Sequence, residues 1–212
     1  MAVMDINVFS VMLRHGMDVT VVLPDDIDDE EQLKCVWLYH GGSGDNTEWL
    51  YHTALVDTVE KRHFAAVLPN VDESCFVNMN IGNRYESYVA KELPSIIWNM
   101  FDCISKDREK NFVSGLSNGG YGCLHTILKY PDKFSKVGAF SAGDKADAVF
   151  LNDGSEKSIN RIRLFGDGDL HKTEYGLTYL ADLFIEKELP KIQIYHACGS
   201  LDPVSYTHLT LP

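Results

Sequence analysis

The sequence has no long apolar run and comparatively little positive charge. Its 212 residues contain 19 Lys and Arg against 31 Asp and Glu, which gives a formal net charge of −12. An acidic surface disfavours nucleic acids and anionic membranes as partners, because both carry negative charge themselves. No stretch approaches the roughly 18 apolar residues that a membrane span requires. We therefore expect neither a nucleic-acid nor a membrane partner, and the sequence leaves a homo-oligomer open.

The N-terminal segment lacks the basic start and the cleavage site of a secretory signal peptide, and Asp5 interrupts its apolar residues early. The cysteines are few and odd in number, and none forms a Cys-x-x-Cys pair. The five are Cys35, Cys75, Cys103, Cys123 and Cys198. Reduced thiols in a cytoplasmic protein are the simplest interpretation of this pattern.

The most informative stretch is Gly115–Gly119, which reads Gly-Leu-Ser-Asn-Gly. It follows the apolar pair Phe112 and Val113 and precedes a helical pattern. Strand, sharp turn and helix, in that order, form the context in which Gly-x-Ser-x-Gly presents a nucleophilic serine. Glycine is expected at both ends of the motif because a Cβ there would crowd the crossing of strand and helix. We predict that Ser117 is an exposed nucleophile and that the Asn118 N–H is an oxyanion donor. An ordinary Gly-rich loop is the alternative.

A second glycine-rich turn follows the apolar strand expected at Lys34–Tyr39. The next five residues are His-Gly-Gly-Ser-Gly, and a helical pattern comes after them. Hydrolases built around Gly-x-Ser-x-Gly take their other oxyanion donor from the backbone of such a loop. We predict that Gly42, with Gly41 beside it, serves this purpose and that His40 is structural. A plain β–α turn is the alternative for this loop taken alone.

Strands and helices alternate with short connections along the chain, which predicts a mostly parallel sheet with helices on both faces. The expected strands are Ile6–Leu13, Val19–Leu23, Phe64–Pro69, Lys136–Ser141 and Lys191–Ala197, and the expected helices are Arg84–Met100 and Thr173–Lys187. Pro94 predicts a kink or a fresh start within the first of these helices. Residues 145–170 are expected to be mostly irregular. Residues 1–203 would form a single domain.

Asp202 occupies the position that the acid of a catalytic triad requires. It follows the last predicted strand and comes after Ser117 in the chain. An aspartate there would orient a histidine and stabilise its imidazolium form. Asp167 and Asp169 are alternatives, although the loop that carries them has weaker strand context.

These segments together resemble the tributyrin esterases, small serine carboxylesterases of the esterase D type that are related to S-formylglutathione hydrolases and to feruloyl and acetyl-xylan esterases. The resemblance covers nearly the whole chain up to Asp202 and rests on LYHGGSGDNTEWL, SGLSNGGYGCL and LPKIQIYHACGSLD. It implies an α/β-hydrolase fold with Ser117 as nucleophile and Asp202 as acid. Gly42 and Asn118 would be the oxyanion donors, and no metal or cofactor would be needed. Asn118 stands where this family usually has Met, so the pocket wall is more polar.

The general-base histidine of this family lies beyond the acid, in a Gly-Gly-His loop that has no counterpart here. The chain ends ten residues after Asp202, and its last nine residues, 204–212, resemble a translated sequencing adapter. We expect a non-native tail on a truncated hydrolase that lacks its C-terminal strand and helix. His208 lies in this tail and is not adopted as the base. Without a base, Ser117 keeps its proton, and we expect the chain to be nearly inactive.

Three functions remain under consideration. The leading one is hydrolysis of a small-molecule, short-chain acyl ester through a Ser117 acyl-enzyme. The second is S-formylglutathione hydrolysis or carbohydrate ester hydrolysis, which needs the same machinery and a different pocket. The third is a non-catalytic binding protein on a hydrolase fold. It is disfavoured because a binding module has no need of a strained serine.

Overall fold

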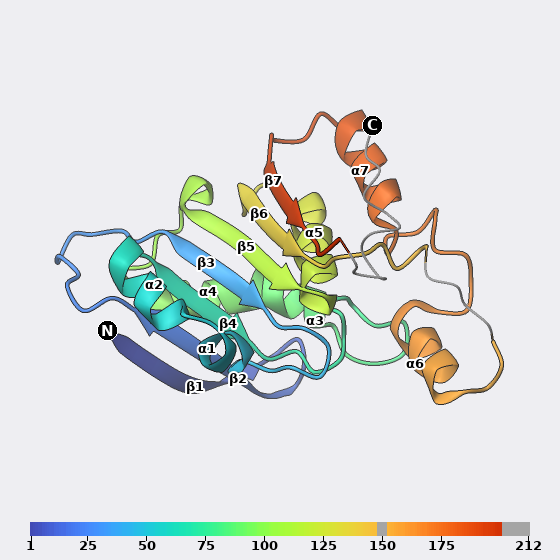
Figure 1. The fold of residues 1–212 in the computed structure, drawn as a ribbon, viewed down its shortest axis with the longest axis horizontal. Helices are drawn as coiled ribbons and strands as arrows, with labels where there is room; N and C mark the ends of the chain where they lie inside the picture. The colour runs from blue at the N-terminus through green and yellow to red at the C-terminus, as the bar shows by residue number, and fades with distance from the viewer. Residues whose placement is uncertain (148–151, 201–212) are drawn as a thin grey trace.

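The computed structural model describes residues 1–147 and 152–200 (Figure 1). The strands are β1 (Ala2–Ser10), β2 (His15–Leu23), β3 (Cys35–Tyr39), β4 (Ala65–Pro69), β5 (Asn111–Leu116), β6 (Lys136–Phe140) and β7 (Gln193–Ala197). The helical elements are α1 (Glu48–His52), α2 (Leu55–Arg62), α3 (Tyr85–Ser87), the π-helix η1 (Tyr88–Glu92), α4 (Leu93–Met100), the 3-10 helix η2 (Arg108–Lys110), α5 (Asn118–Lys129), α6 (Glu156–Phe165) and α7 (Leu177–Glu186).

The seven described strands form one sheet in the order β1-β2-β4-β3-β5-β6-β7. The pairs from β4 through β3, β5 and β6 to β7 are parallel, whereas β1 and β2 pair antiparallel at one edge. The predicted mostly parallel sheet is therefore confirmed. All the parallel strands end at the same edge of the sheet, and α6 lies beyond their C-terminal ends (Figure 1).

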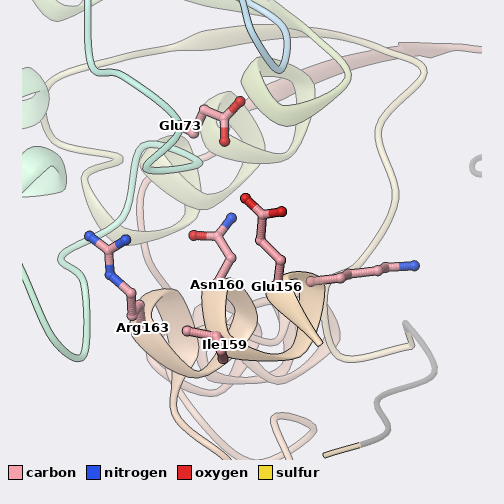
Figure 2. Close-up of a pocket in the computed structure, with 6 residues that line it drawn as sticks. Glu73, Glu156, Ile159, Asn160 and Arg163 are labelled. Atoms are coloured by element: carbon pink, nitrogen blue, oxygen red, sulfur yellow. The ribbon is translucent and has the colours of Figure 1, made fainter. Parts of the chain in front are cut away.

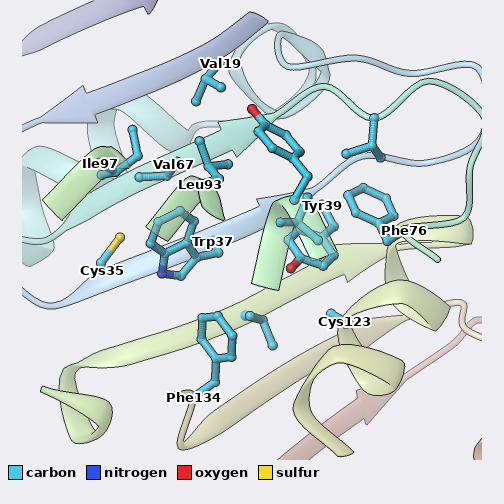
Figure 3. Close-up of a cluster of buried hydrophobic side chains, with 14 of the residues drawn as sticks. Val19, Cys35, Trp37, Tyr39, Val67, Phe76, Leu93, Ile97, Cys123 and Phe134 are labelled. Carbon is cyan, nitrogen blue, oxygen red and sulfur yellow. The ribbon is translucent and has the colours of Figure 1, made fainter. Parts of the chain in front are cut away.

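Helices cover both faces of the sheet, as predicted. Leu55 and Val59 of α2 pack against one face, in a cluster that includes Leu38. The neighbouring strand residues Trp37 and Tyr39 point to the opposite face, because side chains alternate along a strand. There they join the larger core, which also contains residues of η1, α4 and α5; Figure 3 shows part of it. A strand buried on both faces must be apolar throughout, which is why β3 shows no alternation.

The first strand pair turns earlier than the sequence predicted. The predicted strands Ile6–Leu13 and Val19–Leu23 left residues 14–18 for the turn between them, but β1 ends at Ser10 and β2 begins at His15. The carboxylate of Glu92 explains the difference, since it accepts hydrogen bonds from the Ser10 hydroxyl and from the Val11 N–H. This partner lies about 80 residues away in sequence, so no local pattern could have indicated it.

Helix α6 is the element that the sequence analysis missed, because residues 145–170 were expected to be mostly irregular. The side chain of Ser155 caps this helix and accepts a hydrogen bond from the Ser158 N–H at 3.2 Å. Leu164 and Phe165 at its other end are buried. The capping serine and the apolar pair that follows it were a usable signal for a helix in the sequence. The polar residues that lie between them obscured this signal.

Two other helices can be compared with their predictions. The break expected at Pro94 is confirmed, because α3, η1 and α4 follow one another and Pro94 lies near the start of α4. Proline has no N–H for an α-helical bond, and the wider π-turn precedes it. The helix predicted from Thr173 begins only at Leu177.

No helix in the described ranges combines the length and the apolar character that crossing a bilayer requires.

Two residues of α5, His125 and Lys129, form a cluster of ionisable side chains with Glu86 of α3. His125 is fully buried, its Nε2 lies 2.8 Å from the Glu174 carbonyl oxygen, and its Nδ1 lies 3.9 Å from the carboxylate of Glu86. The Lys129 ammonium contacts the same carboxylate at 2.9 Å. Burial is the largest influence on His125 and lowers its pKa to about 4.

This cluster predicts acid sensitivity of the fold. An unfolded chain protonates His125 near pH 6.5, whereas the folded chain resists protonation down to about pH 4. Stability should therefore fall as the pH falls through this window, by about 3 kcal/mol in total. Urea unfolding of wild type and His125→Gln at several pH values measures it. The variant should show a flatter pH dependence, and equal slopes in the two proteins would contradict the assignment to His125.

Candidate active site

Ser117 occupies the sharp turn between β5 and α5. Its backbone has φ 55° and ψ −112°, a region that non-glycine residues rarely adopt. The turn is held on both sides, because the Ser117 N–H donates to the Phe140 carbonyl at 2.8 Å and its own carbonyl accepts from the Tyr121 N–H at 3.0 Å. The residue is exposed. Ser117 is therefore an exposed serine with a strained backbone, as the motif predicted.

The two motif glycines make the turn possible. A Cβ on Gly115 would lie 2.2 Å from the Gly119 carbonyl oxygen, and one on Gly119 would lie 2.3 Å from the Tyr39 carbonyl oxygen. Neither contact is sterically allowed, and backbone atoms cannot rotate away as a side chain can. The expected crowding at the strand–helix crossing is therefore present, and it brings the end of β3 directly against the start of α5.

The loop that follows β3 lies beside the start of α5. A Cβ on Gly42 would meet the side-chain amide of Asn118 at 3.0 Å. Among the described residues, no acceptor is bound to the backbone N–H of Gly42 or of Asn118. The Gly41 N–H, in contrast, donates to the carboxylate of Glu48. Gly41 is thus occupied as a donor in this structure, whereas the N–H groups of Gly42 and Asn118 have no acceptor among the described residues.

Comparison of this chain with known proteins identifies its family. The Esterase family model ("Putative esterase") matches residues 10–202, which is most of the chain. The chain belongs to the Esterase family. It is a serine hydrolase that acts on carboxylic esters. The interpretation as a non-catalytic binding protein is therefore set aside.

Individual relatives agree with this assignment. The esterase is 30% identical to an acetyl esterase of Caldicellulosiruptor saccharolyticus, over 95% of this chain and 81% of the relative. It superimposes on the fluorophosphonate-binding serine hydrolase FphF of Staphylococcus aureus with a TM-score of 0.83 and 29% identity. The S-formylglutathione hydrolase FrmB of the same organism gives 0.79 and 29%. Both structural matches cover 93% of this chain and 79% of the other. The α/β-hydrolase fold is confirmed.

His40 of this esterase is structural, as the sequence analysis expected. Its Nδ1–H donates to the Gly41 carbonyl at 2.8 Å, and its Nε2 accepts from the Val71 N–H at 3.2 Å. Burial lowers the pKa of His40 and so favours the neutral ring. The tautomer is set by its partners, because the Val71 N–H needs an acceptor at Nε2 and the Gly41 carbonyl needs a donor at Nδ1. The ring thus ties the loop after β3 to the loop after β4 and has no free nitrogen for Ser117.

Among residues 1–147 and 152–200, no histidine is hydrogen-bonded to the Ser117 side chain. His171 pairs instead with Asp169 at 2.6 Å and Asp147 at 3.2 Å, and these carboxylates raise its pKa. Asp169, one alternative to Asp202, is therefore paired with His171, which is not hydrogen-bonded to Ser117. Asp202 and His208 lie outside the described residues, so the assignment of Asp202 as the acid and the rejection of His208 as the base remain sequence-based predictions. The described ranges also contain no cluster of three or more metal-ligating side chains.

A polar cavity of about 460 Å³ lies between the loop after β4 and helix α6 (Figure 2). Glu73 borders it on one side, and Glu156, Asn160 and Arg163 reach toward it from α6. Glu73 also accepts a hydrogen bond from Ser43 at 3.2 Å, next to the oxyanion loop. The cavity therefore adjoins the site. Sequence reasoning missed it because it depends on α6, whose residues are far from the others in sequence.

Proposed function

We propose that this esterase hydrolyses short-chain acyl esters of small molecules through an acyl-enzyme on Ser117. The observation that supports it is the strained, exposed serine beside two backbone N–H groups, of Gly42 and Asn118, that carry no acceptor among the described residues. The Ser117 oxygen attacks the ester carbonyl and its proton passes through a base to the departing alcohol. Water then attacks the acyl-serine, and the acid is released. The N–H groups stabilise the negative oxygen at both steps.

The proposal includes the catalytic weakness of the 212-residue chain itself. The family resemblance assigns Asp202 to orient a histidine base, and no described histidine takes that place at Ser117. Loss of one triad member costs roughly 10⁴–10⁶ in rate, while the oxyanion hole retains some catalysis. We also propose a cytoplasmic location, since its five cysteines are free and a reducing compartment preserves that state.

The acyl specificity is tested with p-nitrophenyl acetate, butyrate and octanoate, assayed with added imidazole as a replacement base. We expect acetate and butyrate to react at least about tenfold faster than octanoate, as a pocket fitted to short acyl chains excludes longer ones. Rates are compared after subtracting those of the Ser117→Ala protein. A Ser117-dependent rate that is highest on octanoate would refute the short-chain proposal.

S-formylglutathione hydrolysis is the second candidate. It is supported by the match to an S-formylglutathione hydrolase and by the polar cavity, whose Glu73 and Arg163 offer opposite charges to a polar leaving group. Formyl thioesters of glutathione and of mercaptoethanol share one acyl group and differ in the leaving group alone. A preference for the glutathione thioester of about tenfold or more, reduced in Arg163→Met, would favour this candidate. Equal rates would exclude it.

A further inference from the structure

We propose that Lys145 is a positioning residue that turns the side-chain amide of Asn118 toward the oxyanion loop, where the amide donates a third hydrogen bond to the reacting ester oxygen. The inference rests on the proposed acyl-enzyme mechanism at Ser117. It adds two side-chain groups that neither the Gly-x-Ser-x-Gly motif nor the loop after β3 contains.

The side chain of Asn118 lies between two different neighbours. Its Oδ1 accepts a hydrogen bond from the Lys145 ammonium at 2.8 Å. Its Nδ2 lies 3.0 Å from the point where a Cβ on Gly42 would stand. The amide nitrogen is therefore on the side of the oxyanion loop, against Gly42.

The chemistry of Lys145 fixes which way this amide faces. The oxygen and nitrogen of an asparagine side chain have nearly the same shape, so hydrogen bonding must decide between the two orientations. An ammonium has three donors and no acceptor, which means that only the Asn118 oxygen can face it. The opposite end, the Nδ2–H₂ group, must then face Gly42. No acceptor is bound to Nδ2 among the described residues, so its protons remain available for a ligand.

Lys145 is itself held in place. Its Nζ lies 5.4 Å from the centre of the Tyr121 ring, within range of a cation–π contact, and the side chain is half-buried. Tyr121 is fully buried, and its hydroxyl donates to the Tyr175 carbonyl at 2.8 Å. A fixed cation also draws electron density toward the Asn118 oxygen and makes the Nδ2 protons better donors. Preorganised donors of this kind stabilise a developing oxyanion more than the neutral ground state.

A double-mutant cycle tests the inference, with Ser117-dependent hydrolysis of p-nitrophenyl butyrate in imidazole as the readout. The proteins are wild type, Asn118→Met, Lys145→Met, the double variant and Lys145→Arg. Asn118→Met keeps the backbone N–H and removes the side-chain donor, so we expect kcat to fall about tenfold with little change in KM. Lys145→Met should lower kcat severalfold alone and cause no further loss when Asn118 is already Met. Lys145→Arg keeps donors to the Oδ1 atom and should stay within about threefold of wild type.

The outcomes separate this inference from the function on which it rests. If imidazole-assisted hydrolysis is the same in wild type and Ser117→Ala, the proposed function fails. If hydrolysis depends on Ser117 but Lys145→Met lowers kcat equally with Asn118 or Met at position 118, Lys145 acts independently of the amide and the positioning role is overturned. Wild-type kcat in Asn118→Met would likewise overturn the third hydrogen bond.

Discussion

Without an added base, the 212-residue chain is expected to hydrolyse p-nitrophenyl butyrate roughly 10⁴–10⁶-fold more slowly than a serine esterase with a complete triad. Triad residues act as a unit, so removing a second member costs little once the first is missing. We therefore expect Ser117→Ala to have almost no further effect under these conditions. Nitrophenol release by the two proteins, measured side by side, checks this. A strong burst from wild type that disappears in Ser117→Ala would show that the chain has a working base.

Added imidazole is expected to stimulate ester hydrolysis that depends on Ser117. A diffusing base lacks the positional advantage of a bound histidine, but proton transfer from Ser117 can still gain roughly tenfold or more from it. The stimulation should be absent in Ser117→Ala, which reports the direct reaction of imidazole with the ester and serves as the matched control. Equal stimulation of wild type and Ser117→Ala would contradict the assignment of Ser117 as nucleophile.

Gly119→Ala is expected to destabilise the fold by about 3 kcal/mol or more. The new Cβ would lie 2.3 Å from the Tyr39 carbonyl oxygen and 2.4 Å from that of His40. Both atoms belong to the backbone, so relief requires β3 and α5 to move apart, and overpacking of this kind is costly. Urea unfolding of the purified variant measures the change.

Gly168→Ala is the matched control for that experiment. A Cβ there has no neighbour within 4 Å, so its stability should stay within about 0.5 kcal/mol of wild type. If Gly119→Ala unfolded at the same urea concentration as wild type, the close crossing of β3 and α5 would not exist in solution. In that case the convergence of Gly42 and Asn118 would also lose its basis.

The segments that sequence reasoning placed correctly are those whose structure is encoded by adjacent residues. The apolar runs of β3, β4 and β6 predict buried parallel strands, because both faces of such strands are covered. Pro94 marks the helix break because its missing N–H acts within one turn. The β1–β2 turn and α6 were placed wrongly, since the turn depends on Glu92 from a distant helix and α6 on apolar contacts with the rest of the domain.

The sequence by itself predicted Ser117 as the nucleophile and determined the conformation of its turn. Gly115, Ser117 and Gly119 act through the local sterics of a strand that turns sharply into a helix, and neighbouring residues are enough to specify that conformation. Tertiary structure decided which backbone and side-chain groups lie around this turn and which of them are already hydrogen-bonded. Glu48 occupies the Gly41 N–H and leaves that of Gly42 unpaired among the described residues, and Lys145 orients Asn118 from 27 residues away. Hydrogen bonds across such distances exist only once the sheet has brought its strand ends together, so no local pattern contains them.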